Sequence, residues 1–148
     1  YGDVALICTQ AKQLGLKVPF FGGDGWESPK LLELGKDAVE GHYFSTHYHP
    51  AVSSAKSKAF VTAYQKRYNS APDAMAALGY DSMMILADAI KRAGSTEGAK
   101  LKAALAATKG FDGVTGVTTI DAERNASKAA VILQVAEGKF RYLETITP

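Results

Sequence analysis

The residue best suited to chemistry in this sequence is Asp24, which lies between glycines in the stretch VPFFGGDGWESPKLLELG, residues 18–35. In open α/β folds, ligands bind beyond the carboxyl ends of the strands, where such a turn lies. A phosphate site would use backbone N–H groups, avoid a carboxylate and end in Lys-Ser or Lys-Thr. Asp24 therefore indicates a site for a cationic group such as an ammonium. The alternative is a tight turn in which Asp24 bonds only to nearby backbone.

Two aromatic residues are further candidates for a binding site. Trp26 follows Asp24 by two residues and could form an apolar or cation–π wall, or could pack as part of the fold. Tyr80 lies among apolar residues in the middle of an expected helix. Core packing is the default interpretation of Tyr80 unless other observations indicate a pocket.

The histidines and the cysteine do not form a recognisable reactive site. His47 and His49 would share one face of a strand, whereas His42 would point the other way, and no suitably spaced cysteine or carboxylate completes a metal site. Cys8 lies on an apolar helix stripe, which favours a buried structural thiol. The sequence has no G-x-S-x-G motif and no recognisable pairing of serine, histidine and acid. We therefore expect surface or packing histidines, no metal site, no cofactor and no enzyme.

The composition is that of an ordinary globular chain. Of the 148 residues, 47% are apolar and 22% are charged, and the formal net charge is +2. This charge gives no argument for a nucleic-acid partner or an anionic membrane. No apolar run approaches the roughly 20 residues of a membrane span, and a single cysteine excludes an internal disulfide.

The first third of the chain predicts alternating helices and strands. We expect a helix over 3–14 capped by Asp3, a strand over 18–21, a helix from Ser28 to Gly35, and a strand over 39–48. The first helix has one apolar stripe, formed by Val4, Ile7, Cys8, Ala11 and Leu14. Because a helix and strand of this kind normally follow an earlier strand, we interpret the chain as starting in mid-fold.

The remainder predicts a helical block followed by strands. We expect helices over 55–69, 75–93 and 97–107, the last capped by Ser95 or Thr96. The helix over 75–93 is apolar almost all round and should be the best-buried element, with a narrow solvated edge formed by Asp81, Asp88, Lys91 and Arg92. After Gly110, strands and a hairpin at Glu137-Gly138 are expected. The predicted fold class is α/β.

Five stretches, in this order, resemble a known family: CTQAKQLGLKVPFFGGDGWESPKLLEL, AVEGHYF, FVTAYQKRYNSAPDAMAALGYDSMMILADAIKRAGS, FDGVTGVTTIDAERNASK and VILQVAEGKFRYL. The family is that of the solute-binding proteins of branched-chain amino-acid ABC transporters, the Leu/Ile/Val-binding type of periplasmic-binding protein type I. The resemblance is to the C-terminal portion of that family's chain only.

The resemblance implies a two-lobed α/β clamp that closes on a free amino acid. Residues 1–50 would belong to the second lobe and residues 51–117 to the first lobe. Residues 118–148 would form a hinge crossing and return to the second lobe, which explains the terminal antiparallel strand pair.

The resemblance also assigns binding roles to four residues. Asp24 would receive the α-ammonium of the ligand, and Tyr80 would close over the ligand from the first lobe. Trp26 matches the family motif, and Tyr1 lies near a family aromatic that lines the cleft.

The sequence departs from the family in lacking the N-terminal part, with the hydroxyl and backbone N–H groups that hold the ligand carboxylate. We therefore expect this chain alone to bind an amino acid weakly. A second expected partner is an ABC permease in the membrane. We also expect the open apolar edge of strand 18–21 to pair with the missing N-terminal part or with a second copy of the chain. The expected location is periplasmic or extracellular.

Three alternatives remain open from the sequence. The first is the ectodomain of an amino-acid-sensing receptor. The second is a receiver-like or flavodoxin-like signalling domain with Asp24 as phosphoacceptor, which would need further acids and a lysine for which we find no convincing set. The third is an α/β enzyme, which the missing nucleophile–base pair disfavours.

Overall fold

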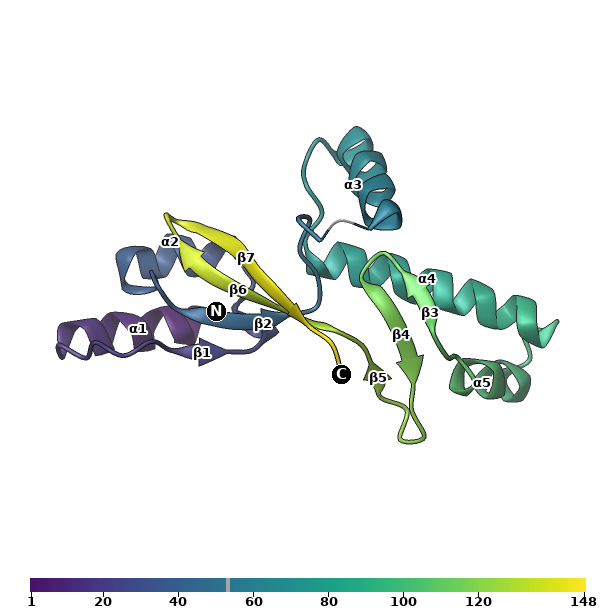
Figure 1. Ribbon diagram of the computed structural model, residues 1–148. Helices are drawn as coiled ribbons and strands as arrows, with labels where there is room; N and C mark the ends of the chain where they lie inside the picture. The colour runs from purple at the N-terminus through teal and green to yellow at the C-terminus, as the bar shows by residue number, and fades with distance from the viewer. Residues whose placement is uncertain (53) are drawn as a thin grey trace. The chain divides into compact units, whose positions relative to one another are not determined.

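The computed structural model describes residues 1–52 and 54–148, and the chain divides into two compact units (Figure 1). Unit 1 comprises Tyr1–His47 and Ala130–Ile146, and unit 2 comprises Tyr48–Ala129 with Thr147–Pro148. The prediction that residues 1–50, 51–117 and 118–148 distribute over the lobes of a clamp stays a prediction.

Unit 1 is built on a four-stranded sheet with the order β1-β2-β6-β7. Strands β1 and β2 are parallel, and the remaining pairs are antiparallel. The elements of this unit are α1 (Gly2–Gln13), β1 (Phe21–Gly22), the 3-10 turn η1 (Asp24–Trp26), α2 (Pro29–Gly35), the 3-10 turn η2 (Lys36–Ala38), β2 (Tyr43–Thr46), β6 (Ala130–Ala136) and β7 (Lys139–Ile146).

Local signals set the ends of two of these elements as predicted. The Oγ of Ser28 accepts a hydrogen bond from the N–H of Lys30 (3.2 Å), with Pro29 at the first position of α2. Glu137 and Gly138 both have positive φ and turn β6 into β7, as in a two-residue hairpin.

The core of unit 1 is formed by buried residues of its strands and helices. Strand β6 is its best-buried element, and it packs Val131, Leu133 and Val135 at 3% exposure or less. Cys8 is buried as predicted, and burial raises the pKa of its thiol.

The predicted stripe of α1 is only partly correct. Cys8 and Ala11 are buried, but Ile7 and Leu14 are exposed, because α1 contacts α2 and η2 and these cover one narrow face. The predicted cap is wrong, since the helix begins after Tyr1 and Asp3 lies inside its first turn.

Strand β1 is shorter than the predicted strand over 18–21 and lies at the edge of the sheet. Val18 and Phe21 are more than half exposed. The predicted open apolar edge is therefore confirmed for the part of the chain that the structure describes.

His42 is expected to make the chain less stable on acidification. Its Nδ1 accepts a hydrogen bond from the N–H of Phe20 (3.4 Å), and its ring packs edge-on against Phe20. Burial lowers the pKa of this imidazole. The unfolded chain therefore takes up a proton at higher pH than the folded chain, so the free energy of unfolding falls as the pH decreases from about 7 to 5. Urea unfolding at pH 7 and pH 5 should show a smaller fall in the free energy of unfolding for His42→Gln than for the wild type. An equal fall would contradict the assignment of this pH dependence to His42.

In its described residues, unit 2 combines three helices with a three-stranded antiparallel sheet of order β3-β4-β5. Helix α4 contacts both α5 and β3. Figure 1 shows β3 running alongside α4. The elements are α3 (Ala55–Tyr68), α4 (Ala74–Ala93), α5 (Gly98–Ala106), β3 (Phe111–Gly113), β4 (Gly116–Ile120) and β5 (Ala126–Ser127).

Two helices of this unit begin at side-chain caps and one does not. The side chains of Ser54 and Asp73 accept hydrogen bonds from the N–H groups of Ser57 (3.0 Å) and Ala76 (2.8 Å) and cap α3 and α4. The cap predicted for α5 is wrong, because the helix begins after Glu97 without a side-chain cap.

The prediction that the helix over 75–93 is the best-buried element is wrong. Met75, Tyr80 and Met83 of α4 are exposed, because the elements that contact α4 cover only part of its apolar surface. Asp81, which we placed on the solvated edge, is 4% exposed. Its carboxylate is buried because it meets donors from the turn between β3 and β4.

Within the residues that the structure describes, no helix combines the length and apolar character needed to cross a membrane.

Candidate functional site

The candidate site of unit 1 lies at the carboxyl end of the parallel pair β1–β2. Asp24 begins η1 two residues after β1, and His47 follows β2 directly. The register pairs Gly22 with Phe44, so the residues just beyond the two strands meet at one edge of the sheet. Asp24 therefore lies beyond the carboxyl end of a strand, as the glycine-rich sequence around it predicted.

The carboxylate of Asp24 has a partner that the sequence reasoning missed. Its Oδ2 lies 3.1 Å from the Nε2 of His47. The Asp24 side chain is 50% exposed and the His47 side chain 41%, so the pair is open to solvent. The parallel pairing of the two strands was the signal that could have connected these residues.

Trp26 fixes the shape of the turn that carries Asp24. A Cβ placed on Gly22 would meet the indole of Trp26 at 2.1 Å, so only glycine allows this approach. The indole also packs near Phe44, with ring centroids 6.1 Å apart. Trp26 thus has a packing role, and its contact with a ligand stays a prediction.

Two further contacts hold the turn in place. The carboxylate of Glu27 accepts a hydrogen bond from the hydroxyl of buried Thr46, which ties the end of η1 to β2. The N-terminal ammonium of Tyr1 donates to the carbonyl of Gly25 (3.0 Å). The structure therefore brings the backbone of Tyr1 to the turn that carries Asp24 and Trp26.

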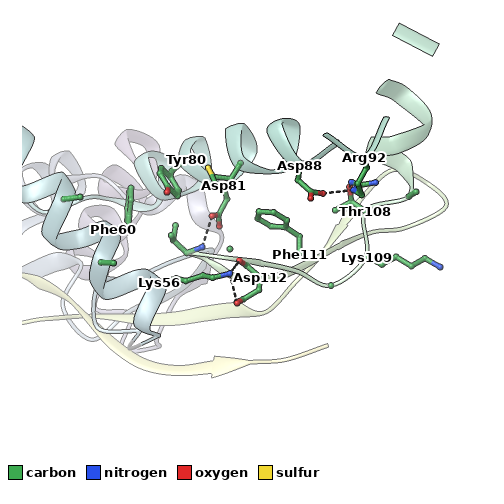
Figure 2. Close-up of a pocket in the computed structure, with 17 residues that line it drawn as sticks. Lys56, Phe60, Tyr80, Asp81, Asp88, Arg92, Thr108, Lys109, Phe111 and Asp112 are labelled. Carbon is green, nitrogen blue, oxygen red and sulfur yellow. Dashed lines mark hydrogen bonds and ion pairs between the residues drawn. The ribbon is translucent and has the colours of Figure 1, made fainter. Parts of the chain in front are cut away.

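Tyr80 lies in unit 2 and lines a cavity there. The cavity has a volume of about 900 Å³, and Figure 2 shows it beside α4. The centroid of the Tyr80 ring is 5.0 Å from that of Phe60, and Tyr80 is 45% exposed. The default interpretation of Tyr80 as a core residue is therefore wrong, because Tyr80 is an exposed residue.

The charged residues Lys56, Asp88, Arg92 and Asp112 line this cavity and pair with one another. Lys56 donates to the backbone carbonyl of Asp112 (2.6 Å) and pairs with its carboxylate (2.7 Å). Arg92 pairs with Asp88 and donates to the hydroxyl of Thr108 (2.9 Å). Lys56 thus connects α3 to β3, and Arg92 connects α4 to the segment before β3 (Figure 2).

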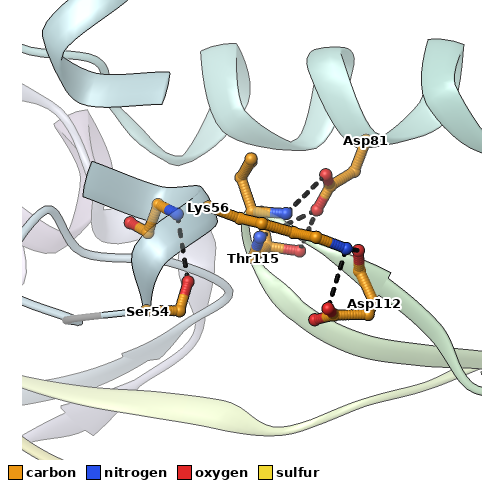
Figure 3. A network of polar contacts seen from close by, with 7 residues as sticks. Ser54, Lys56, Asp81, Asp112 and Thr115 are labelled. Atoms are coloured by element: carbon orange, nitrogen blue, oxygen red, sulfur yellow. Dashed lines mark hydrogen bonds and ion pairs between the residues drawn. The ribbon is translucent and has the colours of Figure 1, made fainter. Parts of the chain in front are cut away.

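Asp81 anchors the turn between β3 and β4 to α4. One carboxylate oxygen accepts from the N–H of Val114 (2.8 Å), and the other accepts from the N–H (2.8 Å) and hydroxyl (2.7 Å) of Thr115 (Figure 3). A Cβ on Gly113 would lie 2.5 Å from Asp81, so the carboxylate sits directly against the turn backbone. Asp81 thereby positions the turn beside the helix that carries Tyr80.

Comparison with known proteins shows the family of this chain. Residues 1–139 match the family described as periplasmic binding protein. The chain belongs to this family. The description of the family implies an extracytoplasmic location.

Solved structures of this family resemble the chain closely. A leucine-binding protein from Thermotoga maritima is 42% identical, with a TM-score of 0.91 over 99% of this chain. A branched-chain amino-acid transporter substrate-binding protein from Streptococcus pneumoniae, solved with isoleucine, is 36% identical with a TM-score of 0.86. The predicted mixed α/β fold of the periplasmic-binding type is therefore confirmed.

The chain spans about two fifths of the length of these relatives. It covers 42% of each of the two solved structures. It is also 25% identical over 146 residues to Leu/Ile/Val-binding protein homolog 1 of Brucella abortus and covers 39% of it. The family and these neighbours are solute-binding proteins, several of them named as components of ABC transporters.

Proposed function

We propose that this periplasmic binding protein chain is the C-terminal part of the solute-binding component of an amino-acid ABC transporter, and that Asp24 receives the α-ammonium of a free, branched-chain amino acid. One observation carries the proposal. The half-exposed carboxylate of Asp24 stands at the carboxyl end of two parallel strands, where open α/β folds bind ligands.

The surroundings of Asp24 support a cationic ligand. In the part of the chain that the structure describes, the partner of its carboxylate is the imidazole of His47, and no lysine or arginine pairs with it. A carboxylate accepts at two oxygens, so an ammonium can form a charge-assisted hydrogen bond beside the imidazole. The names of the relatives, which include leucine-binding and isoleucine-bound proteins, support a branched-chain ligand.

The proposed mechanism is closure of two lobes around the ligand, followed by docking to a membrane permease. A ligand favours the closed state only through contacts that it makes in that state. Tyr80, an exposed residue, is the proposed contact from the first lobe, and Trp26 and Tyr1 are proposed to line the second. In this role the chain is a binding component rather than an enzyme.

We further propose that the exposed edge of β1 packs in the whole protein against the remaining part of the family's chain or against a second copy of this one. Phe21 of β1 is more than half exposed, as are Leu16 and Val18 in the segment before it. Because the partners of the ligand carboxylate are expected outside these residues, binding by this chain alone is weak. The same clamp could serve a sensing receptor; the phosphoacceptor alternative has no specific observation in its favour.

Leucine binding is expected to depend on the charge of Asp24. Asp24→Asn should weaken binding of L-leucine about tenfold or more, because it removes a charge-assisted hydrogen bond of about 1.5 kcal/mol or more. Two-dimensional NMR titration at pH 7.5 with up to tens of millimolar leucine detects such weak binding, and 4-methylpentanoate, which lacks the ammonium, should shift the same signals much less.

The matched control is Asp37→Asn. Asp37 is an exposed carboxylate of the same unit that pairs with Lys12 (2.5 Å), so its neutralisation should leave leucine binding unchanged. Equal binding of leucine to the wild type and to Asp24→Asn would remove the proposed role of Asp24.

A further inference from the structure

A titratable partner already occupies part of the carboxylate that the proposed ligand needs. The Nε2 of His47 lies 3.1 Å from the Oδ2 of Asp24, and both side chains are open to solvent. We propose that His47 and the ammonium of the ligand compete for Asp24, so that amino-acid binding releases a proton from His47 and weakens as the pH falls. This inference rests on the proposed function of Asp24.

The positions of Asp24 and His47 bring the imidazole and an approaching ammonium to the same carboxylate. Parallel pairing of β1 with β2 places the residues after both strands at one edge of the sheet, and the bond between Glu27 and Thr46 holds η1 against β2. An ammonium that approaches Asp24 from solvent therefore meets the imidazole at hydrogen-bond distance from the same carboxylate.

The protonation state of the imidazole changes what the carboxylate can accept. A neutral imidazole donates one Nε2–H to Oδ2, which leaves Oδ1 for an ammonium. An imidazolium already neutralises the carboxylate, and a bound ammonium would place a second positive charge on the same acid. The site therefore favours binding in which the imidazolium gives its proton to the buffer and the ammonium keeps its own.

Few other charged groups stand on the surrounding elements of the described chain. Glu27 accepts from Thr46, the N-terminal ammonium of Tyr1 donates to the carbonyl of Gly25, and Lys30 pairs with Glu33 on α2 (2.6 Å). Of these kinds of group, imidazole and the α-ammonium ordinarily change charge between about pH 5 and 8. We assign the pH dependence to His47 because its ring, and not the ammonium, contacts the carboxylate of Asp24.

The test is leucine titration by NMR at pH 5.5 and pH 7.5 with the 148-residue chain, its His47→Gln variant and its His49→Gln variant. Glutamine at position 47 keeps an N–H donor near Asp24 without a titrating charge. In the wild type, the dissociation constant for leucine should rise several-fold between pH 7.5 and pH 5.5. Release of one proton on binding limits this rise to about tenfold per pH unit. His49→Gln, which removes an imidazole whose Nδ1 accepts from the backbone N–H of Ala51, should keep this rise, whereas His47→Gln should lose it.

A second measurement follows the imidazole itself. Saturating leucine should shift the titration of the His47 ring signals to lower pH, because the ligand opposes protonation.

The outcomes separate the two proposals. If His47→Gln showed the same pH dependence as the wild type, the proposed competition would be overturned, while leucine binding by Asp24 would stand. A pH dependence caused by the N-terminal ammonium would give this result. Absence of leucine binding at both pH values, or full binding by Asp24→Asn, would instead overturn the proposed function and this inference with it.

Discussion

Replacing Asp81 by alanine is expected to lower the free energy of unfolding by about 3 kcal/mol or more. The carboxylate accepts three hydrogen bonds, from two backbone N–H groups and the hydroxyl of Thr115, all within a buried turn. Alanine leaves these donors without an acceptor, and each unsatisfied buried donor costs about 1–3 kcal/mol. Urea denaturation followed by circular dichroism measures the change.

Two comparison variants make this prediction specific. Asp81→Asn should be intermediate, because the amide has one acceptor oxygen in place of two. Asp88→Ala, on the same helix, removes an acid that is paired with Arg92 at the surface and should cost about 1 kcal/mol or less. A loss for Asp81→Ala no greater than that for Asp88→Ala would show that the turn between β3 and β4 does not depend on the carboxylate.

Replacing Gly22 by alanine is expected to displace Trp26 and to destabilise unit 1 by about 2 kcal/mol. The new Cβ would meet the indole at 2.1 Å, so the ring or the strand must move. Trp26 is the single tryptophan of the chain, so its fluorescence reports the displacement directly. Because Trp26 ends the turn that Asp24 begins, the variant should also weaken leucine binding.

Gly23→Ala is the matched control for this prediction. A Cβ on Gly23 meets nothing within 4 Å, and the residue has a φ of −99°, which alanine readily adopts. Its tryptophan emission and its stability should stay close to those of the wild type. If Gly22→Ala left both properties as they are in Gly23→Ala, the close packing of Trp26 on β1 would be refuted.

Burial was the property that sequence patterns predicted least well. The pattern of α1 and α4 identified side chains able to pack, but Leu14 and Met83 are exposed because the described elements beside them cover only one face. Asp81 shows the reverse error. We predicted that this charged residue among apolar ones lies on a solvated edge, whereas it is buried. A buried carboxylate is stable there because distant backbone donors satisfy it.

The sequence by itself determined the features that depend on neighbouring residues. Ser28 and Pro29 start α2, Glu137 and Gly138 turn the last hairpin, and the glycines around Asp24 form a turn after β1, because caps and turns are made by residues a few positions apart. The resemblance to the family also came from ordered local motifs. Only the tertiary structure decided that His47 meets Asp24. That contact joins residues on separate strands, and the alignment of two strands is set by the packing of the whole sheet rather than by either segment alone.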